Sequence, residues 1–492
     1  MSFGEDIRSL VNEALDPALS KAGSWARIPL GQVATILNGY PWKSKYFDNT
    51  TGVALIRIRD VTTGMTETFY NGPTVDGFWI EQGDLLVGMD GDFNLRRWNS
   101  DRGLLNQRVC KITTDPDAYS SEFLEYILPP YLRLINDNTS SVTVKHLSSR
   151  TLAEIPLPLP PLAEQRRIVA KLDVLTARLA DARGQLDRIP ALTKQLRKRS
   201  VSRAFDGSLT ADWRMARGDS KIVTDDALDQ AYRIEAGSLR RKPPAEIDWR
   251  PSFDIPSSWR WVSIDQVVAQ VQYGSSAKTT SDSSGVPVLR MGNIQRGKLD
   301  LTDLKYLPRD HDEFPDLLLN EGDVLFNRTN SLELVGKTAV YKRLDKPTSF
   351  ASYLIRIRPS GVLPELLSAY LNSPFARSWI ERVANQQVGQ ANVNGSKLKA
   401  LGIPLPPFDE QAEILQRLST VFAHADHLEA ESARARVLLD RMEASILTKA
   451  FKGELVPQDP QDEPAIVLLD RIRAQRTFPH ERKGRRTGTA PA

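Results

Sequence analysis

The sequence of 492 residues has very little cysteine and no long apolar run. Its single cysteine, Cys110, excludes internal disulfides and zinc sites built from thiolates, and it is typical of proteins kept in a reducing compartment. No apolar run is long enough to span a bilayer, and the first residues, Met-Ser-Phe-Gly-Glu-Asp-Ile-Arg, do not have the pattern of a signal peptide. We therefore expect a cytoplasmic protein with no membrane partner.

An excess of charge is also lacking. The chain has 65 Lys and Arg against 61 Asp and Glu, and the net charge of +4 says little about a nucleic-acid partner. Basic residues do cluster locally, in residues 194–203, 240–242 and 471–486. Such runs are usually solvated faces or chain ends, so they give only weak support for a polyanion partner.

Motifs of phosphate binding and methyl transfer are incomplete. Gly336-Lys337-Thr338 resembles the end of a phosphate-binding loop, but Ser331 stands where the phosphate-cradling turn needs a glycine. Leu128-Pro129-Pro130-Tyr131 resembles the Asn/Asp-Pro-Pro-Tyr loop of amino-group methyltransferases. Leu128 has no side-chain oxygen to accept a hydrogen bond from a target amine. We interpret this segment as a helix interruption before Leu132.

Metal-binding patterns fail in a similar way. Pro315-Asp316 with Glu321 and Asp323 resembles part of a nuclease site, but a lysine is expected where Asp323 stands. A turn is the better interpretation, because Gly322-Asp323 repeats an earlier Gly83-Asp84. His424 and His427 lie one helical turn apart with no third ligand nearby, which favours a solvated helix face. The sequence thus predicts no catalytic residue, no metal site and no cofactor bound by this chain.

A long internal repeat is present instead. Residues 157–165 read Leu-Pro-Leu-Pro-Pro-Leu-Ala-Glu-Gln, and residues 403–411 read Ile-Pro-Leu-Pro-Pro-Phe-Asp-Glu-Gln. A charged amphipathic run follows each motif and ends in Ala-Phe-x-Gly-x-Leu, at residues 204–209 and 450–455. Equivalent residues of the two copies are 246 positions apart throughout, which indicates a duplicated unit.

Each copy is predicted to form one long helix that begins after the Pro-rich segment. Apolar residues step by three and four along both runs, and this heptad pattern is typical of coiled coils. The seam residues are Ile168, Leu172, Leu175, Leu179, Ala182, Leu186 and Ile189 in the first run, and Ile414, Leu418, Val421, Ala425, Leu428, Ser432, Ala435, Leu439, Met442 and Ile446 in the second. The two seams are expected to pair, and Pro190 to kink or split the first helix. Ordinary core helices of an α-rich enzyme, the alternative, would not repeat in this way.

The segments before the two helices also correspond. Trp259 follows Trp25 by 234 positions and Asp323 follows Asp84 by 239, so the two segments share a pattern and differ in loop lengths. We therefore predict an α+β protein with two similar mixed α/β domains and two long helices. The predicted segments are an N-terminal helical segment (1–23), a first domain (24–156), a first long helix (157–209), a connector (210–257), a second domain (258–402), a second long helix (403–455) and a C-terminal connector with a basic tail (456–492).

The paired Pro-Leu-Pro-Pro-x-x-Glu-Gln motifs, the helices that end in Ala-Phe-x-Gly-x-Leu, and the domains that begin at Trp25 and Trp259 resemble the specificity subunit of type I restriction-modification systems. The resemblance implies two target recognition domains, each reading half of a bipartite double-stranded DNA site, and antiparallel helices that act as a spacer. It implies two modification subunits that methylate adenine with S-adenosylmethionine. It also implies two restriction subunits that use ATP and Mg. The chain itself is then expected to be non-catalytic.

Candidate site residues follow from side-chain chemistry and from the resemblance. Arg, Lys, Asn and Asp on domain loops can pair with base edges, although each also fits an exposed loop residue or a turn amide. The DNA-binding candidates are Lys43, Lys45, Arg57, Asp90, Arg96, Arg97, Lys278, Arg290, Asn293, Asn327, Arg328 and Asn330. The candidates for binding partner subunits are Pro160, Pro161, Glu164, Gln165, Pro406, Pro407, Glu410 and Gln411.

Two other functions remain open from the sequence. A stand-alone two-headed DNA-binding regulator would have the same duplication, but such regulators usually carry a helix-turn-helix, and none is recognisable. A structural hinge protein with duplicated protein-binding domains is the second alternative.

Overall fold

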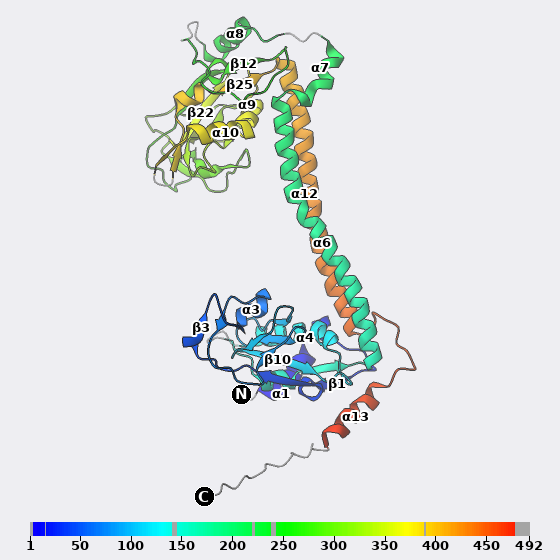
Figure 1. The fold of residues 1–492 in the computed structure, drawn as a ribbon. Helices are drawn as coiled ribbons and strands as arrows, with labels where there is room; N and C mark the ends of the chain where they lie inside the picture. Colours follow the sequence, from blue (N-terminus) through cyan, green and yellow to red (C-terminus); the bar gives the residue numbers. More distant parts are fainter. Residues whose placement is uncertain are drawn as a thin grey trace. The chain divides into compact units, whose positions relative to one another are not determined.

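A computed structural model describes residues 3–14, 16–139, 145–218, 222–237, 243–387 and 390–477. The chain forms two compact units (Figure 1). Unit 1 consists of Met1–Leu186 and Arg434–Ala492, and unit 2 of Asp187–Ala433. We call the globular part of unit 1 head 1 (residues 3–159) and that of unit 2 head 2 (residues 243–405). Each unit also contains part of both long helices.

Head 1 combines three sheets with short helices. The paired strands β1 (Ala26–Pro29) and β11 (Pro156–Leu159) form one sheet. A second sheet has the order β2 (Ala34–Asn38), β10 (Val109–Thr114), β7 (Leu85–Gly88), β8 (Leu95–Arg97). The third has the order β3 (Phe47–Asp48), β5 (Phe69–Tyr70), β4 (Val53–Ile56), β9 (Gly103–Leu105), β6 (Trp79–Ile80). The helices are α1 (Phe3–Glu13), α2 (Leu30–Val33), α3 (Ile58–Thr63), α4 (Ser121–Asn138) and α5 (Ser149–Glu154).

Head 2 has corresponding sheets. The first pairs β12 (Arg260–Ser263) with β25 (Gly402–Leu405). The second has the order β13 (Val268–Tyr273), β22 (Leu354–Pro359), β18 (Val324–Asn327), β20 (Thr338–Val340). The third has the order β17 (Lys305–Leu307), β14 (Val286–Leu289), β21 (Ser349–Phe350). Two small sheets are added, β15 (Ile294–Gln295) with β16 (Lys298–Leu299), and β19 (Thr329–Asn330), β24 (Gln390–Asn392), β23 (Asn385–Gln387). The helices are α9 (Pro364–Leu371), α10 (Pro374–Val383) and α11 (Gly395–Lys399).

The strand orders of the two heads are the same where the sequence pattern repeats. The order β2-β10-β7-β8 corresponds to β13-β22-β18-β20, and the parallel pair β4 with β9 corresponds to β14 with β21. The predicted turns also match, since Asp84 and Asp323 each accept a backbone N–H from the residue three positions earlier at 2.8 Å. The prediction of two similar mixed α/β domains is therefore confirmed.

Two helices of 44 residues each follow β11 and β25, namely α6 (Leu162–Phe205) and α12 (Phe408–Phe451). Both begin directly after the Pro-rich segment, because the residues before a proline favour extended backbone. The residues from 157 to 159 and from 403 to 405 are strand, so each helix begins later than the predicted segment that contains it. At 1.5 Å per residue each helix is about 66 Å long.

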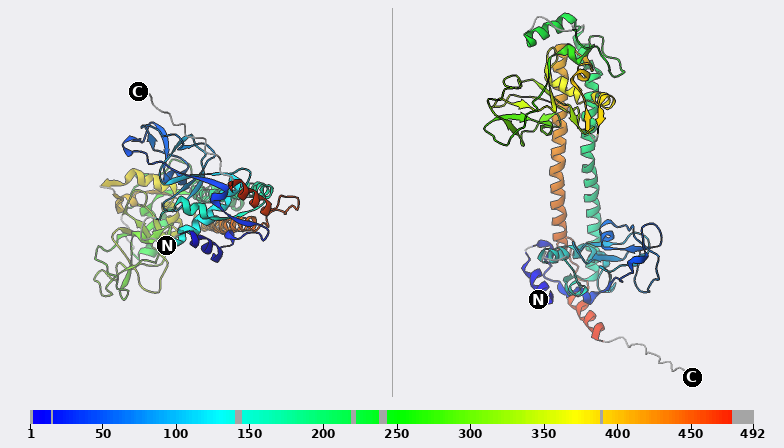
Figure 2. Two further views of the ribbon diagram at one scale, coloured as in Figure 1. Left: turned by 90° about the horizontal axis from the view of Figure 1, so that it is seen from below. Right: turned by 90° about the vertical axis from the view of Figure 1, so that its left-hand side faces the viewer.

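Within each unit, the parts of the two long helices run antiparallel and side by side (Figures 1 and 2). In unit 1, Arg183 Nη2 bonds to Asp440 Oδ1 at 2.7 Å and to Glu443 Oε2 at 2.6 Å. In unit 2, Thr193 Oγ1 donates to Glu429 Oε1 at 2.6 Å. The predicted seam is confirmed at its buried positions, which are Ile168, Leu172, Leu179, Ile414, Leu418, Ala425 and Ser432. Leu428 and Met442 are exceptions, with 36% and 52% of their surfaces exposed.

The helix α4 continues through Pro129 and Pro130, so the predicted interruption before Leu132 is wrong. The helix α6 continues through Pro190, so it is not split there, and a kink at Pro190 stays a prediction. A proline removes one backbone hydrogen bond from a helix. Packing of the flanking turns offsets this loss, since Leu128 and Tyr131 are buried in α4 and Thr193 is buried in α6. Leu128-Pro129-Pro130-Tyr131 is therefore an ordinary buried helical segment.

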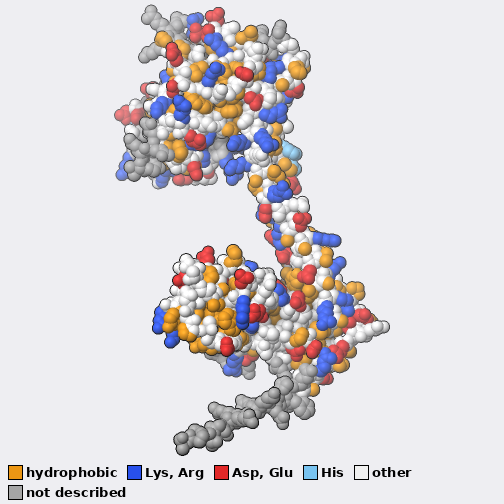
Figure 3. Space-filling model, viewed as in Figure 1, with side chains coloured by type: hydrophobic (Ala, Val, Ile, Leu, Met, Phe, Trp, Pro, Cys, Tyr) orange, Lys and Arg blue, Asp and Glu red, His pale blue; other side chains and the backbone are white. Residues whose placement is uncertain are grey.

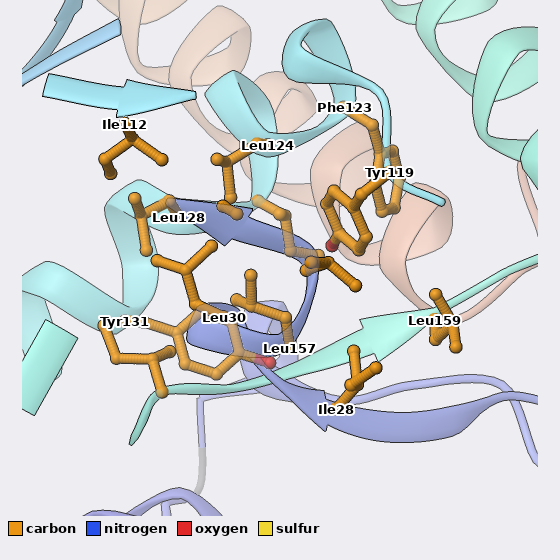
Figure 4. Close-up of a cluster of buried hydrophobic side chains, with 14 of the residues drawn as sticks. Ile28, Leu30, Ile112, Tyr119, Phe123, Leu124, Leu128, Tyr131, Leu157 and Leu159 are labelled. Atoms are coloured by element: carbon orange, nitrogen blue, oxygen red, sulfur yellow. The ribbon is translucent and has the colours of Figure 1, made fainter. Parts of the chain in front are cut away.

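Each head buries the beginning of one long helix and the end of the other. In unit 1 the core of head 1 contains Ile168 of α6 and Phe451 of α12, and the Phe451 ring lies 6.5 Å from that of Phe123. In unit 2 the core contains Ile414 of α12 and Phe205 of α6, whose ring lies 5.0 Å from that of Tyr370. Figure 4 shows part of the head 1 core, with Ile28, Leu30, Ile112, Tyr119, Phe123, Leu124, Leu128, Tyr131, Leu157 and Leu159 labelled.

The segments outside the heads are helical as well. Unit 2 contains α7 (Ala211–Arg217) and α8 (Asp225–Ala236), and α8 buries Leu228 in the core of head 2. Unit 1 contains α13 (Ala465–Thr477), which buries Leu468 and Ile472 in the core of head 1. The two connectors therefore each add a helix to a head.

Candidate nucleic-acid interface

The glutamines of the repeated motif fasten each long helix to its head. Gln165 Nε2 donates to the carbonyl of the proline five residues earlier at 2.9 Å, and its Oε1 accepts the Ser120 N–H at 2.8 Å. Gln411 makes the equivalent bonds, at 3.1 Å to the proline carbonyl and 2.8 Å from the Leu363 N–H. Both side chains are buried, so their hydrogen-bonding groups are used inside the units.

The motif glutamates are also buried and bind a tryptophan of the same head. Trp25 Nε1 donates to Glu164 Oε2 at 3.0 Å, and Trp259 Nε1 donates to Glu410 Oε2 at 2.7 Å. Burial raises the pKa of the Glu164 carboxyl, and the bond from Trp25 opposes this shift. Glu410 also accepts a hydrogen bond from Thr210.

The four Glu and Gln side chains were predicted to contact partner subunits, and in the structure they are buried and bonded inside their units. Glu164 Oε1 is buried without a hydrogen-bond partner among the described residues. Pro160 and Pro406 are buried as well, whereas Pro161 and Pro407 are partly exposed. Partner contact at the last two residues stays a prediction.

The DNA-binding candidates of head 1 fall into two groups. Lys43 and Lys45 are exposed on the segment before β3, and Arg57 is half-buried at the start of α3. Arg96 donates to the backbone carbonyls of residues 61 and 62 at 2.6 Å, at the end of α3. Arg97 Nε pairs with a Glu125 carboxylate oxygen at 2.7 Å. The last two arginines therefore have structural contacts, and the first three side chains have more freedom to bind DNA.

In head 2, two candidates have structural roles. Asn293 is buried, accepts the Arg290 N–H at 2.8 Å, and donates to two backbone carbonyls. Asn327 is buried and donates to the Leu334 carbonyl at 3.2 Å. Both amides hold turns of the backbone together, and DNA contact by these two residues stays a prediction. Lys278 is exposed, while Arg290 pairs with Asp303 at 2.8 Å.

The remaining head 1 candidate, Asp90, lies in a polar cluster just after β7. His146 Nδ1 is 2.7 Å from Asp90 Oδ1, and Arg108 Nε is 3.6 Å from Asp90 Oδ2. Arg108 has a φ of 73°, a left-handed conformation that non-glycine residues rarely adopt. The structure thus joins Asp90 to two residues that sequence reasoning did not select.

The remaining head 2 candidates lie just after β18. The Arg328 guanidinium is 4.7 Å from the centre of the Tyr273 ring, and Arg328 Nη2 donates to Asn392 Oδ1 at 3.3 Å. Asn330 is partly exposed, two residues further along the chain. Tyr273 and Asn392 were not selected from the sequence either. One signal could have found Asn392, since it lies 246 positions after His146.

The motifs of other chemistries have structural explanations. Gly336 has a φ of 87° and precedes β20, and a Cβ there would meet Ile380 at 2.0 Å, so its turn serves packing. His424 and His427 are both exposed on α12. Cys110 is buried in β10, and burial raises the pKa of its thiol to about 12.

Within the part of the chain that the structure describes, no group of three or more His, Cys, Asp or Glu could hold a metal ion. Among the same described residues, no helix is long and apolar enough to cross a membrane. Figure 3 shows basic and acidic side chains intermixed over the face drawn, so charge alone does not mark an interface there.

The chain matches a family model described as type I restriction modification DNA specificity domain over residues 23–190 and again over 256–435. It is 34% identical to the type I restriction enzyme EcoBI specificity subunit of Escherichia coli, over 99% of both chains. It is 28% identical to the EcoKI specificity subunit of Escherichia coli strain K12, over 94% of this chain and 97% of the relative.

Solved structures show the same fold. A chain from a study of complex assembly and conformational transition of the type I R-M system has a TM-score of 0.61 and 20% identity, and covers 89% of this chain and 100% of its own length. The HsdS subunit from Thermoanaerobacter tengcongensis has a TM-score of 0.53 and 20% identity, over 88% of this chain and 98% of that one.

Proposed function

The chain belongs to the type I restriction-modification DNA specificity family, and from this premise we propose that it is the DNA-reading subunit of such a system. Each head reads one half of a bipartite double-stranded DNA site. The chain has no catalytic role of its own and binds no cofactor. The methylation and cleavage reactions belong to other subunits, which supply S-adenosylmethionine, ATP and Mg.

The observation that carries this proposal is one fold used twice with the same attachment to the helices. Each head has the same strand order and the same tryptophan–glutamate and glutamine contacts at the start of a long helix. Because the loops of the two heads differ in length and in side chains, the two half-sites need not have the same sequence.

The long helices suit the role of a spacer between half-sites. Binding two half-sites on one duplex depends on the distance and the helical phase between them, and one turn of DNA is about 34–36 Å. Helices of about 66 Å with a packed seam could set such a distance. They also offer exposed side chains, including those of Val437 and Leu438, for the modification subunits. We expect two modification and two restriction subunits in the full complex.

Purification with the modification subunits of the same host tests the proposal. The expected result is co-purification and methylation of adenine within a single bipartite motif, detected by methylation-sensitive sequencing. Tight sequence-specific binding by the chain alone, with no methylation when the partners are added, would favour the stand-alone regulator. The comparisons give that alternative no support.

A further inference from the structure

The two heads carry different side chains at one equivalent place on the scaffold. After β7, the Leu147 N–H donates to the Met89 carbonyl at 2.7 Å; after β18, the Val393 N–H donates to the Arg328 carbonyl at 2.9 Å. Both donors come from the residue that precedes the N-cap of α5 or α11. The two hydrogen bonds occupy the same place in the two heads, and Met89 is therefore equivalent to Arg328.

Two further pairs of bonds extend the equivalence. The Met89 N–H donates to the Arg108 carbonyl at 2.8 Å, and the Arg328 N–H donates to the Tyr353 carbonyl at 3.0 Å. Isolated pairing of Asp90 with His146 corresponds to pairing of Thr329 in β19 with Asn392 in β24. Arg108 thus corresponds to Tyr353, and His146 to Asn392. We call these positions the variable edge, formed by Met89, Asp90, Arg108 and His146 in head 1 and by Arg328, Thr329, Tyr353 and Asn392 in head 2.

Several equivalent positions elsewhere in the two copies keep the same residue type. The pairs are Trp25 and Trp259, Asp84 and Asp323, Glu164 and Glu410, Gln165 and Gln411, and Phe205 and Phe451. All of them are side chains that pack or bond inside a unit. At the variable edge the backbone bonds are kept and every side chain differs. The shared backbone bonds form in both heads with different side chains, so these side chains are not needed to build the scaffold.

Met89 is buried in the core of head 1, but the other side chains of the variable edge are partly or largely exposed and rich in hydrogen-bonding groups. In head 1 the exposed fractions are 55% for the Arg108 side chain and 46% for that of His146. In head 2, Tyr353 is 49% exposed, and Tyr273, whose ring lies against Arg328, is 43% exposed. These groups can form new bonds without disrupting a core.

Neighbouring groups hold the edge side chains in defined directions. Asp90 lies against both His146 and Arg108, and the left-handed backbone of Arg108 is a strained conformation of the kind found at functional sites. The Tyr273 ring supports the Arg328 guanidinium, and the Tyr273 hydroxyl accepts the Gly395 N–H at 2.8 Å. A guanidinium held in this way is suited to two parallel hydrogen bonds with guanine, and an asparagine amide to adenine.

We propose that the variable edge determines the base sequence of each half-site, with Arg108 and His146 reading for head 1 and Arg328 and Asn392 reading for head 2. The proposal deepens the proposed function and rests on it. Asp90 and Tyr273 are positioning residues that orient the two arginines. Because the two edges offer different donors and acceptors at the same place, each head selects different bases with one scaffold.

The test compares complexes of the full chain with the modification subunits, carrying Arg108→Ala, Arg328→Ala or Asn392→Ala. Each variant should lose methylation of its cognate site by about 10- to 100-fold and relax base preference in one half of the motif only, since one base contact is lost. Arg150→Ala in head 1 and Arg309→Ala in head 2 are controls that each remove one exposed charge of the same head.

A reciprocal exchange separates reading from a structural role. His146→Asn and Asn392→His place at each position a side chain that the equivalent position accommodates in the other head. The expected result is a changed preferred base in the corresponding half-site, with the other half unchanged. If the wild-type complex recognises a bipartite site and every edge variant methylates the same motif as the wild type, this inference alone is overturned. A wild-type complex without a bipartite motif would overturn the proposed function.

Discussion

Glu164 in unit 1 and Glu410 in unit 2 occupy the same position at the start of a long helix, and each accepts a hydrogen bond from a tryptophan. Their charges are compensated differently. Glu410 forms an ion pair with Arg214, which also donates to the Gly207 carbonyl. Near Glu164, Arg167 pairs with Asp462 instead, at 2.5 Å. The hydrogen-bonded geometry is thus common to both copies, whereas the compensation of charge belongs to each unit.

A second pair of equivalent acidic residues, Asp84 and Asp323, differs in the burial of the ion pairs. Asp84 pairs with Lys111 at 3.0 Å, and both side chains are about one-fifth exposed, at 22% and 19%. Asp323 is 1% exposed and lies 3.0 Å from Arg358, which is 20% exposed, and 3.9 Å from Arg356, which is 2% exposed. The turn is the same in both heads, but the aspartate of head 2 forms a buried pair with Arg356 in addition to its partly exposed pair. A repeated fold therefore does not make equivalent residues equally important for stability.

The largest effect is expected from a change in the long helices, which both units share. Insertion of one heptad into α6 alone, after Leu186, should misalign the seam with α12 and abolish DNA recognition. Matched insertions after Leu186 and after Ala433 should restore it and lengthen the spacer of the DNA site by about 3 base pairs, from about 10 Å of added helix. The motif methylated by each complex measures the spacer. An unchanged spacer in a folded double insertion would contradict the role of the helices.

Asp323→Asn and Asp84→Asn test the two ion pairs. Removing one partner of a buried pair leaves an uncompensated charge, so Asp323→Asn should destabilise unit 2 by about 4 kcal/mol. Asp84→Asn should cost unit 1 about 1 kcal/mol, because water solvates the partly exposed Lys111. Hydrogen exchange in β18 and β7 reports each unit separately. Equal losses in both units would show that burial of the pair does not decide its contribution.

Glu410→Gln and Glu164→Gln compare the two motif glutamates with the tryptophan bond retained. Glu410→Gln leaves the largely buried Arg214 without its ion pair and should destabilise unit 2 by about 3 kcal/mol. Glu164→Gln removes a buried charge and should change the stability of unit 1 by about 1 kcal/mol or less. Exchange of amide protons in β12 and β1 measures the two effects. A larger loss of stability for Glu164→Gln than for Glu410→Gln would contradict the interpretation that Glu410, and not Glu164, compensates a buried arginine.

The smallest effect concerns pH. The folded state raises the pKa of Glu164 above its ordinary value of 4.5, so folded unit 1 binds this proton more tightly than the unfolded chain does. The contribution of this group to the stability of unit 1 should therefore increase as the pH falls from above the raised pKa toward 4.5, and be lost as the pH rises. The difference between the wild-type chain and Glu164→Gln isolates it from other carboxylates. A difference that does not depend on pH would contradict the shift.

Much of the architecture could be predicted from the sequence because it depends on local patterns. The apolar steps of three and four predict the long helices, and the prolines before Leu162 and Phe408 mark where the helices begin. Pro190 does not split α6, although a proline costs a helix one backbone hydrogen bond.

The site was harder to predict, because hydrogen-bonding side chains look alike in a sequence. Asn293 and Asn327 have the chemistry of base-reading residues, but burial commits them to the backbone. Arg108 and His146 are 38 positions apart and meet only because β10 and the segment before α5 both lie beside the end of β7.

The sequence by itself determined the duplication, the two helical seams and the absence of familiar catalytic motifs, because periodicity and spacing are properties of the chain. Tertiary structure alone decided which polar side chains remain accessible. The two motif glutamates and the two motif glutamines are buried and bonded inside the units. Side chains of the variable edge such as Arg108 and His146 are exposed. The physical reason is that a polar group must stay accessible to bind a partner, and folding buries the motif side chains.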